Sequence, residues 1–271
     1  MLSATFLLAL GSVANALLLV AGLYIYVSLI RQISGRRSTS PNGSTTRFGL
    51  PEAVLAAGLT FLLLFGVLAS VSKPSVQQFN GRVLVENLLF TLGIVLVVVA
   101  FLRLRGFDLN LLGGFSQTSF LRALSTGTIL MLAAYPLIAL ADAITQRLLG
   151  SGSSKQSIVE LFNGSRTIEQ RIIIIIFAVV VAPAAEEFLF RFFLYGVLKR
   201  FFGRFFGLTA NALLFAAVHT HLPSFAPLFV LGSCFTIAYE WSGSILVSMT
   251  MHALFNSVSL TLLAFPELFS Q

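Results

Sequence analysis

The stretch Arg171 to Leu198, RIIIIIFAVVVAPAAEEFLFRFFLYGVL, is an apolar run with three charged residues near its middle. It exceeds the length of about 20 residues that an α-helix needs to cross the hydrocarbon core of a bilayer. Glu186, Glu187 and Arg191 lie where each charge costs about 2.5–3.5 kcal/mol on insertion scales. The stretch therefore predicts a membrane helix in which interactions or a function of the three charged groups offset their insertion cost.

The composition of the whole chain agrees with this prediction. Of the 271 residues, 57% are hydrophobic and 10% are charged, and the mean hydropathy is +0.94. Soluble domains carry about a quarter charged residues. We therefore expect an all-α, polytopic transmembrane bundle of about eight membrane helices, namely Met1–Ile30, Gly49–Ser72, Val83–Leu102, Leu124–Leu140, Arg171–Leu198, Phe206–His219, Phe225–Tyr239 and Ser244–Phe265.

The basic residues fall mainly in the segments between these helices. The formal charge is +7, but no basic amphipathic stripe occurs, so we expect no nucleic-acid partner. Lys199–Arg204 is expected to be a basic loop. The segments after the first, third and fifth helices are rich in Arg and Lys, which favours a cytoplasmic position for them and an outside N-terminus. We expect a multi-pass integral protein of a bacterial-type plasma (inner) membrane, with the lipid bilayer and a membrane-associated peptide or protein as its partners.

The charged residues of the fifth helix have a spacing that separates their roles. Glu187 and Arg191 are four residues apart, with the acid N-terminal, and this order favours an ion pair on one helix face. Glu186 is rotated by about 100° from Glu187, so the same arginine serves it less well. It is expected to remain a free carboxylate. Pro183 should disturb the helix and release backbone carbonyls next to these residues.

Further polar residues follow in the next helices. Phe215 and His219 are four residues apart, so the aromatic ring can pack on the imidazole. His252 and Asn256 repeat this spacing in the last helix. His221, in the turn before Pro223, fits a capping role better than His219 does. Taken singly, these residues also fit an ion cluster or hydrogen bonds that only fix helix packing.

Together, these groups suit amide hydrolysis without a covalent intermediate. Glu186 with His219 could activate a water molecule, and His252 with Asn256 could donate hydrogen bonds to the oxyanion. No serine or cysteine stands at a recognisable nucleophile spacing from a histidine. We expect no cofactor. The alternative is a zinc ion bound by Glu186, His219 and His252, although the HExxH signature of zinc peptidases is absent.

Three motifs now carry a resemblance. They are EExxxR (Glu186, Glu187, Arg191), FxxxH (Phe215, His219) and HxxxN (His252, Asn256). In this order on successive helices, they resemble the CAAX protease and bacteriocin-processing (CPBP, abortive-infection-like) family of intramembrane endopeptidases. The resemblance covers residues 172–260, about a third of the chain.

The resemblance implies about eight helices around a hydrated polar cavity that opens to one side of the membrane. It also implies that Glu186 and His219 activate water, that His252 and Asn256 form the oxyanion hole, and that Glu187 and Arg191 support them. Phe192 departs from the family pattern, because many members have glycine after the arginine, and it is expected to narrow the cavity.

These observations divide the chain into four parts. Residues 1–150 hold N-terminal transmembrane helices without an assigned role, 151–171 form a polar loop, 172–265 form the protease-like catalytic core, and 266–271 are a C-terminal tail. The leading hypothesis is a glutamate-dependent intramembrane endopeptidase acting on a membrane-associated substrate, lipidated or not. Two alternatives remain: a noncatalytic scaffold or bacteriocin-immunity protein, and a transporter that couples to protons through Glu186.

Overall fold

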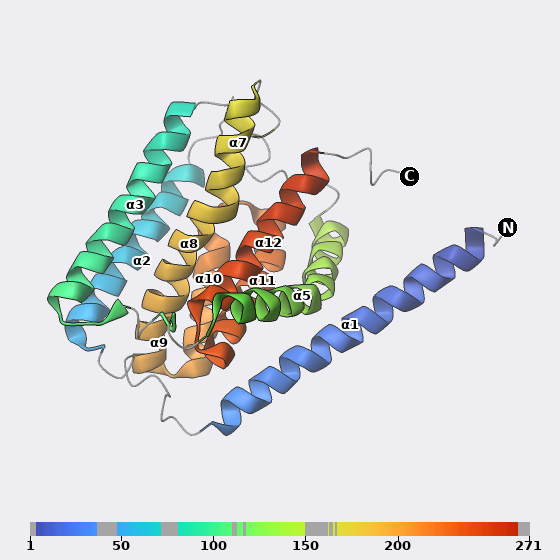
Figure 1. Ribbon diagram of the computed structural model, residues 1–271, viewed down its shortest axis with the longest axis horizontal. Helices are drawn as coiled ribbons and strands as arrows, with labels where there is room; N and C mark the ends of the chain where they lie inside the picture. Colours follow the sequence, from blue (N-terminus) through green and yellow to red (C-terminus); the bar gives the residue numbers. More distant parts are fainter. Residues whose placement is uncertain are drawn as a thin grey trace.

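The protein is described by a computed structural model that covers residues 4–36, 48–71, 81–109, 113–115, 118–149, 162, 165 and 167–264. Within these ranges the regular structure is helical and includes no strand (Figure 1). Seven helical spans there are long and apolar enough to cross a membrane, and α10 (Arg204–Val218) is a shorter apolar helix of 15 residues. The predicted all-α membrane bundle of about eight helices is confirmed.

The helices follow the predicted order, with longer bounds at several ends. The N-terminal half contains α1 (Ala4–Gly35), α2 (Leu50–Val71), α3 (Gly81–Leu104) and α5 (Phe120–Leu149). The C-terminal half begins with one continuous rod made of α7 (Ile168–Ile176), η2 (Phe177–Val181), α8 (Ala182–Glu187), η3 (Phe188–Leu194) and α9 (Tyr195–Phe202). After α10 come a 3₁₀ turn η4 (Leu222–Ser224), α11 (Phe225–Ser242) and α12 (Ile245–Ala264).

The start of the long rod is set by a local sequence signal. Thr167 and Gln170 form a capping box, in which each side chain accepts a hydrogen bond from the other residue's backbone N–H. Residues 168–171 of the predicted polar loop therefore belong to α7. Most of the rest of that loop, and the whole tail 266–271, lie outside the described residues.

The prediction of a basic loop at Lys199–Arg204 is wrong. Residues 199–202 complete α9, and Gly203 alone, at φ 84°, interrupts the helix before Arg204 begins α10. Glycine is the residue that tolerates this positive φ. Lys199 and Arg204 can lie within helices because both form ion pairs with Glu240, at 2.7 Å and 3.2 Å.

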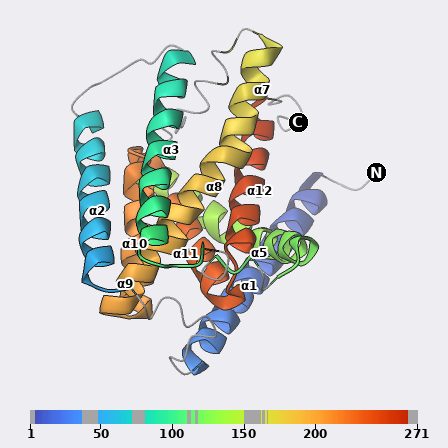
Figure 2. The same ribbon diagram turned by 60° about the vertical axis from the view of Figure 1, so that its left-hand side comes forward.

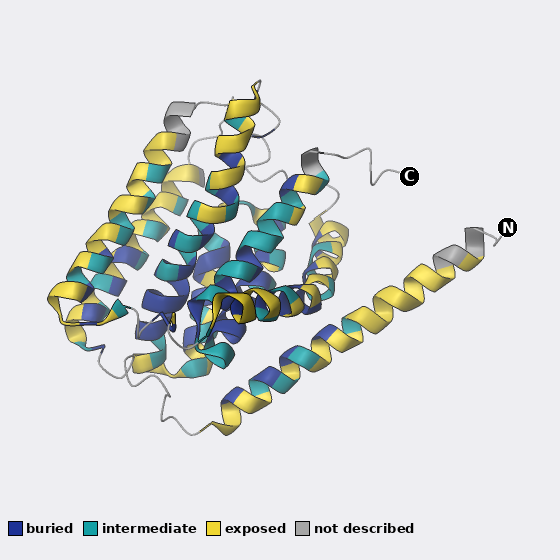
Figure 3. Cartoon of the chain, in the orientation of Figure 1, coloured by how far each residue is buried: buried dark blue, intermediate teal, exposed yellow. Residues whose placement is uncertain are grey.

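The helices arrange around a core made by the C-terminal half. α11 is the most buried span, with 56% of its apolar window inside the protein. Figure 1 and Figure 2 show α2 and α3 on one side of this core and α1 on the opposite side, where α1 crosses α5 obliquely. Burial is concentrated in the middle of the bundle, whereas the outer faces of α1, α2 and α3 are exposed (Figure 3). Exposed apolar faces of this extent are expected where helices contact lipid.

Buried contacts join α2 and α3 to each other at one end. Glu52 is fully buried and accepts hydrogen bonds from Gly49 N–H at 2.6 Å and from Arg105 Nε at 3.0 Å. Next to it, the ring of Phe48 packs against Phe107, with the ring centroids 5.3 Å apart. These contacts join the start of α2 to the end of α3.

The segments predicted to be cytoplasmic also lie at this end of the bundle. Arg204 donates to the carbonyl of Ile33 at 2.8 Å, and Arg36 donates to the carbonyl of Trp241 at 2.8 Å. The ends of α1, α9 and α11 therefore meet there. The basic segments after the first, third and fifth predicted helices share one side, and its identity as the cytoplasmic side stays a prediction.

Candidate functional site

The rod from α7 to α9 leaves regular α-helical geometry on both sides of the two glutamates. Residues 177–181 and 188–194 are π-helical, and the short α8 between them contains Pro183, Glu186 and Glu187. π-Helical turns are rare and occur often at functional sites. Pro183 explains the first of these turns, because it has no N–H to continue the hydrogen-bond ladder.

The carbonyl that loses its backbone donor because of this proline accepts a hydrogen bond from another helix. The N–H of Ala182 donates to Phe177, five residues back, so the next donor in this register would be the N–H that Pro183 lacks. Its acceptor would be the Ala178 carbonyl. Asn256 on α12 supplies the missing hydrogen bond through Nδ2 at 2.7 Å. The predicted release of a carbonyl by Pro183 is confirmed, and the structure adds the partner that satisfies it.

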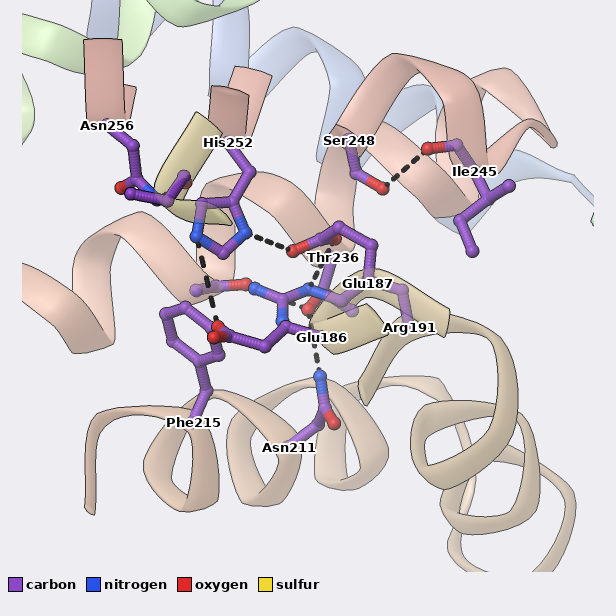
Figure 4. Close-up of polar contacts among 12 residues, drawn as sticks. Glu186, Glu187, Arg191, Asn211, Phe215, Thr236, Ile245, Ser248, His252 and Asn256 are labelled. Carbon is purple, nitrogen blue, oxygen red and sulfur yellow. Dashed lines mark hydrogen bonds and ion pairs between the residues drawn. The ribbon is translucent and has the colours of Figure 1, made fainter. Parts of the chain in front are cut away.

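Glu187 lies at the centre of a buried chain of polar contacts (Figure 4). Its Oε2 is 3.1 Å from Nε of Arg191, and its Oε1 is 2.9 Å from Nδ1 of His252. Glu187 and Arg191 have no exposed side-chain surface. A carboxylate only accepts hydrogen bonds, so Nδ1 of His252 carries the proton and Nε2 faces away from Glu187. The predicted Glu187–Arg191 pair is confirmed, and His252 is its third member.

Aromatic rings surround the arginine. The guanidinium carbon of Arg191 lies 4.3 Å from the ring centroid of Phe215 and 5.1 Å from that of Phe235. The ring of Phe215 is also 4.8 Å from the imidazole of His219 and 5.8 Å from that of His252. Phe215 therefore packs on His219 as predicted, and it also contacts Arg191 and His252.

Glu186 differs from its neighbour in its surroundings. Its side chain is 27% exposed, and its Oε2 is 3.9 Å from Nε2 of His252. No hydrogen-bond partner of this oxygen occurs among the described residues. Arg191 points to Glu187 instead. The rotation between adjacent helix positions thus leaves Glu186 as the carboxylate free of the arginine, as the spacing predicted.

His219 is the C-cap residue that directly follows α10. Its Nδ1 is 2.7 Å from the carbonyl oxygen of Phe215, and a carbonyl only accepts, so Nδ1 carries the proton. In the neutral ring, Nε2 is then the acceptor, the form required of a base. His221 has a different environment, because its Nδ1 lies 3.0 Å from Oγ of Ser224 in the following turn.

A cavity of about 420 Å³ brings the predicted catalytic residues together. Glu186, His219, His252 and Asn256 all line it, and so does Phe215. Glu187 and Arg191 lie behind its wall, in contact with His252 and Phe215 rather than with the cavity. No group of three His, Cys, Asp or Glu side chains with metal-binding geometry occurs in the described part of the chain.

The prediction that Phe192 narrows the cavity is wrong. Phe192 is 1% exposed and does not line the cavity. Its ring stacks on Phe188 at 5.0 Å and meets Phe48 edge-on at 6.4 Å. The π-helical geometry of η3 and the attachment of α2 direct this ring toward the start of α2.

The sequence prediction missed other residues that line the cavity. Asn87 and Thr91 on α3 do so, and they are four residues apart, the same spacing that singled out His252 and Asn256. This polar pair in an apolar helix was a usable signal. Thr220 also lines the cavity and has a φ of 52°, which is uncommon for a β-branched residue. Sequence alone gives no sign of that conformation.

Comparison with known proteins adds the family. Residues 168–258 match the family model of type II CAAX prenyl endopeptidase Rce1-like proteins, which spans about a third of the chain and all three motifs. Searches of the curated proteins and of the solved structures gave no match. The chain is thus a multi-pass membrane protein whose residues 168–258 are similar to the type II CAAX prenyl endopeptidase Rce1-like family.

Proposed function

We propose that the protein is an intramembrane endopeptidase that hydrolyses a peptide bond of a membrane-associated protein or peptide, lipidated or not. The observation that carries this proposal is the shared cavity of Glu186, His219, His252 and Asn256. Glu186 contributes a carboxylate without an arginine partner, and His219 contributes an Nε2 that can accept a proton. These are the groups that activate water without forming an acyl-enzyme.

The reaction begins with a water molecule held by Glu186 and His219. Glu186 takes one proton from the water, and the oxygen adds to the carbonyl carbon of the substrate. The tetrahedral intermediate then collapses as Glu186 returns this proton to the amide nitrogen and the C–N bond breaks. The products are a carboxylic acid and an amine, and no group on the enzyme changes its covalent structure.

His252 and Asn256 stabilise the oxyanion of the intermediate in this proposal. A hydrogen bond from His252 requires a proton on Nε2 in addition to the one on Nδ1, and Glu187, 2.9 Å from Nδ1, stabilises the resulting charge while it also pairs with Arg191. Asn256 uses one amide N–H for the Ala178 carbonyl, so its second N–H is assigned to the oxyanion. Glu187 and Arg191 are positioning residues that act through His252.

The proposed reaction uses no metal ion or other cofactor. Within the described residues, the geometry of the acidic and imidazole side chains supports this, because no three of them converge as metal ligands. We also propose a bacterial-type plasma membrane as the location and expect no nucleic-acid partner. Hydrolysis that persists in a strong chelator would support the metal-free mechanism, whereas loss of activity that zinc restores would replace it with the zinc alternative.

The central experiment compares Glu186→Gln with the wild-type protein in proteoliposomes. The variant should lower the rate of peptide cleavage by at least about 10²-fold, since general acid–base catalysis contributes about 10²–10⁴. Glu169→Gln is the matched control, because Glu169 is exposed in the first turn of α7 on the same rod and lies outside the cavity. It should cleave at the wild-type rate.

Two results would redirect the assignment. Wild-type cleavage by Glu186→Gln would remove Glu186 as the base. Proton-linked solute uptake that depends on Glu186, in the absence of peptide cleavage, would instead identify a transporter.

A further inference from the structure

Part of the cavity wall comes from the N-terminal half of the chain. Leu63 on α2 and four residues of α3 line it, namely Asn87, Phe90, Thr91 and Ile94. Figure 2 shows α3 standing beside α8, the segment that carries Glu186. None of these wall residues lies within the matched segment 168–258. The catalytic residues therefore share their cavity with a part of the chain that the family match does not cover.

Two polar side chains on this wall lack a hydrogen-bond partner in the part of the chain that the structure describes. No hydrogen bond of the Asn87 or Thr91 side chain occurs among the described residues. Among the described helical threonines, Thr60, Thr126 and Thr209 also lack such a bond, whereas Thr128 and Thr250 each donate to the carbonyl four residues back at 2.8 Å. The carbonyl four residues before Thr91 belongs to Asn87, which is itself described.

The spacing of the pair fits an extended peptide. Asn87 and Thr91 are on one face of α3, separated by about 6 Å along the axis at 1.5 Å per residue. Peptide groups on one edge of an extended chain repeat every two residues, or about 6.6–6.8 Å. Both side chains can donate and accept hydrogen bonds. Each can therefore pair with one of two successive peptide groups on the same edge.

The surroundings of Asn87 and Thr91 also favour an extended peptide as the ligand. An extended peptide in a largely apolar cavity needs partners for its N–H and C=O groups, because leaving them unpaired costs several kcal/mol. Leu63, Phe90 and Ile94 flank the pair and provide apolar contacts for the side chains of the peptide. The cavity is continuous from this wall to Glu186.

We infer that Asn87 and Thr91 form a subsite that binds the backbone of an extended, apolar substrate segment and places its scissile carbonyl against Glu186. The inference rests on the proposed function for the identity of the occupant. It gives α2 and α3 a specific role, namely substrate positioning by the part of the cavity wall that they form.

The test measures binding separately from hydrolysis. The probe is a fluorescent farnesylated peptide that ends in Cys-Val-Leu-Ala and has a methylene-amine in place of the scissile amide, used with and without the farnesyl group. The Asn87→Leu/Thr91→Val variant should bind it at least about tenfold more weakly, given the usual net contribution of a hydrogen bond. The matched control is Asn15→Leu/Thr60→Val, which changes the same residue types on α1 and α2 away from the cavity. Its affinity should stay within about twofold of the wild-type affinity.

An ester scan identifies the hydrogen-bonded peptide groups. Replacing each amide of the probe in turn by an ester removes one N–H, and the ester that weakens wild-type binding should have no further effect on the Asn87→Leu/Thr91→Val variant. Equal affinity of that variant and the wild-type protein, or no binding of either peptide by the wild-type protein, would overturn the subsite. Binding that depends on Asn87 and Thr91 without hydrolysis of the cleavable peptide would instead keep the subsite and refute the proposed peptidase.

Discussion

Replacement of Asn256 by leucine should destabilise the protein because it leaves the Ala178 carbonyl without a donor. Ala178 is 4% exposed, and Asn256 Nδ2 donates to its carbonyl at 2.7 Å. Pro183 cannot replace this hydrogen bond, because it has no N–H. An unsatisfied buried polar group costs about 1–3 kcal/mol. We expect the free energy of unfolding to fall by this amount in Asn256→Leu.

A second substitution tests whether the proline is the cause. Pro183→Ala restores an N–H to the rod, and a helix donor can then reach the Ala178 carbonyl. In the Pro183→Ala background, Asn256→Leu should therefore cost about 1–2 kcal/mol less than it does in the wild-type background. The coupling is measured as a double-mutant cycle of SDS-induced unfolding in detergent micelles, followed by circular dichroism.

The refuting result is additivity. If Asn256→Leu costs the same in both backgrounds to within about 0.5 kcal/mol, the two sites are independent. The link from Pro183 through Ala178 to Asn256 would then be wrong, and Asn256 would stabilise the bundle in another way. A matched substitution, Asn211→Leu, removes a buried amide that donates to Thr236 at 3.2 Å and should show no coupling to Pro183→Ala.

Two further pairs of substitutions give expected changes in the free energy of unfolding in the same assay. Arg191→Met should lower the free energy of unfolding by about 3–5 kcal/mol, because the substitution leaves Glu187 charged and fully buried. Arg105→Met should cost less, since Arg105 is 46% exposed. Equal effects of the two substitutions would contradict the role of burial. Thr220→Gly should raise the free energy of unfolding by about 1 kcal/mol, because glycine relieves the positive φ of 52°. Thr220→Val keeps the strain and should give no such gain.

Contacts within a single helix could be predicted from sequence. The Glu187–Arg191 pair, the Phe215–His219 contact and the separate position of Glu186 depend only on helix periodicity, and the structure contains all three. The release of a carbonyl by Pro183 was predictable for the same reason, since it follows from the chemistry of the proline ring.

Contacts between helices were harder to predict from the sequence. The hydrogen bond of Asn256 to Ala178 and that of His252 to Glu187 join residues 78 and 65 positions apart. Membrane helices such as α11 and α12 are apolar on nearly all sides, so hydrophobic periodicity does not show which face turns inward. Phe192 illustrates this, because its place after Arg191 suggested the cavity, whereas packing directs it to Phe48.

The sequence by itself determined that the chain is a helical membrane protein and that the helices of its last third carry a set of acid, imidazole and amide groups. The length and apolarity of each span and the local spacing of polar residues are sufficient for that. Only the tertiary structure decided that α3 completes the cavity with Asn87 and Thr91, and that Asn256 donates a hydrogen bond to the rod made of α7 to α9. These features depend on how each helix is rotated and tilted against its neighbours, and side-chain packing between helices sets both.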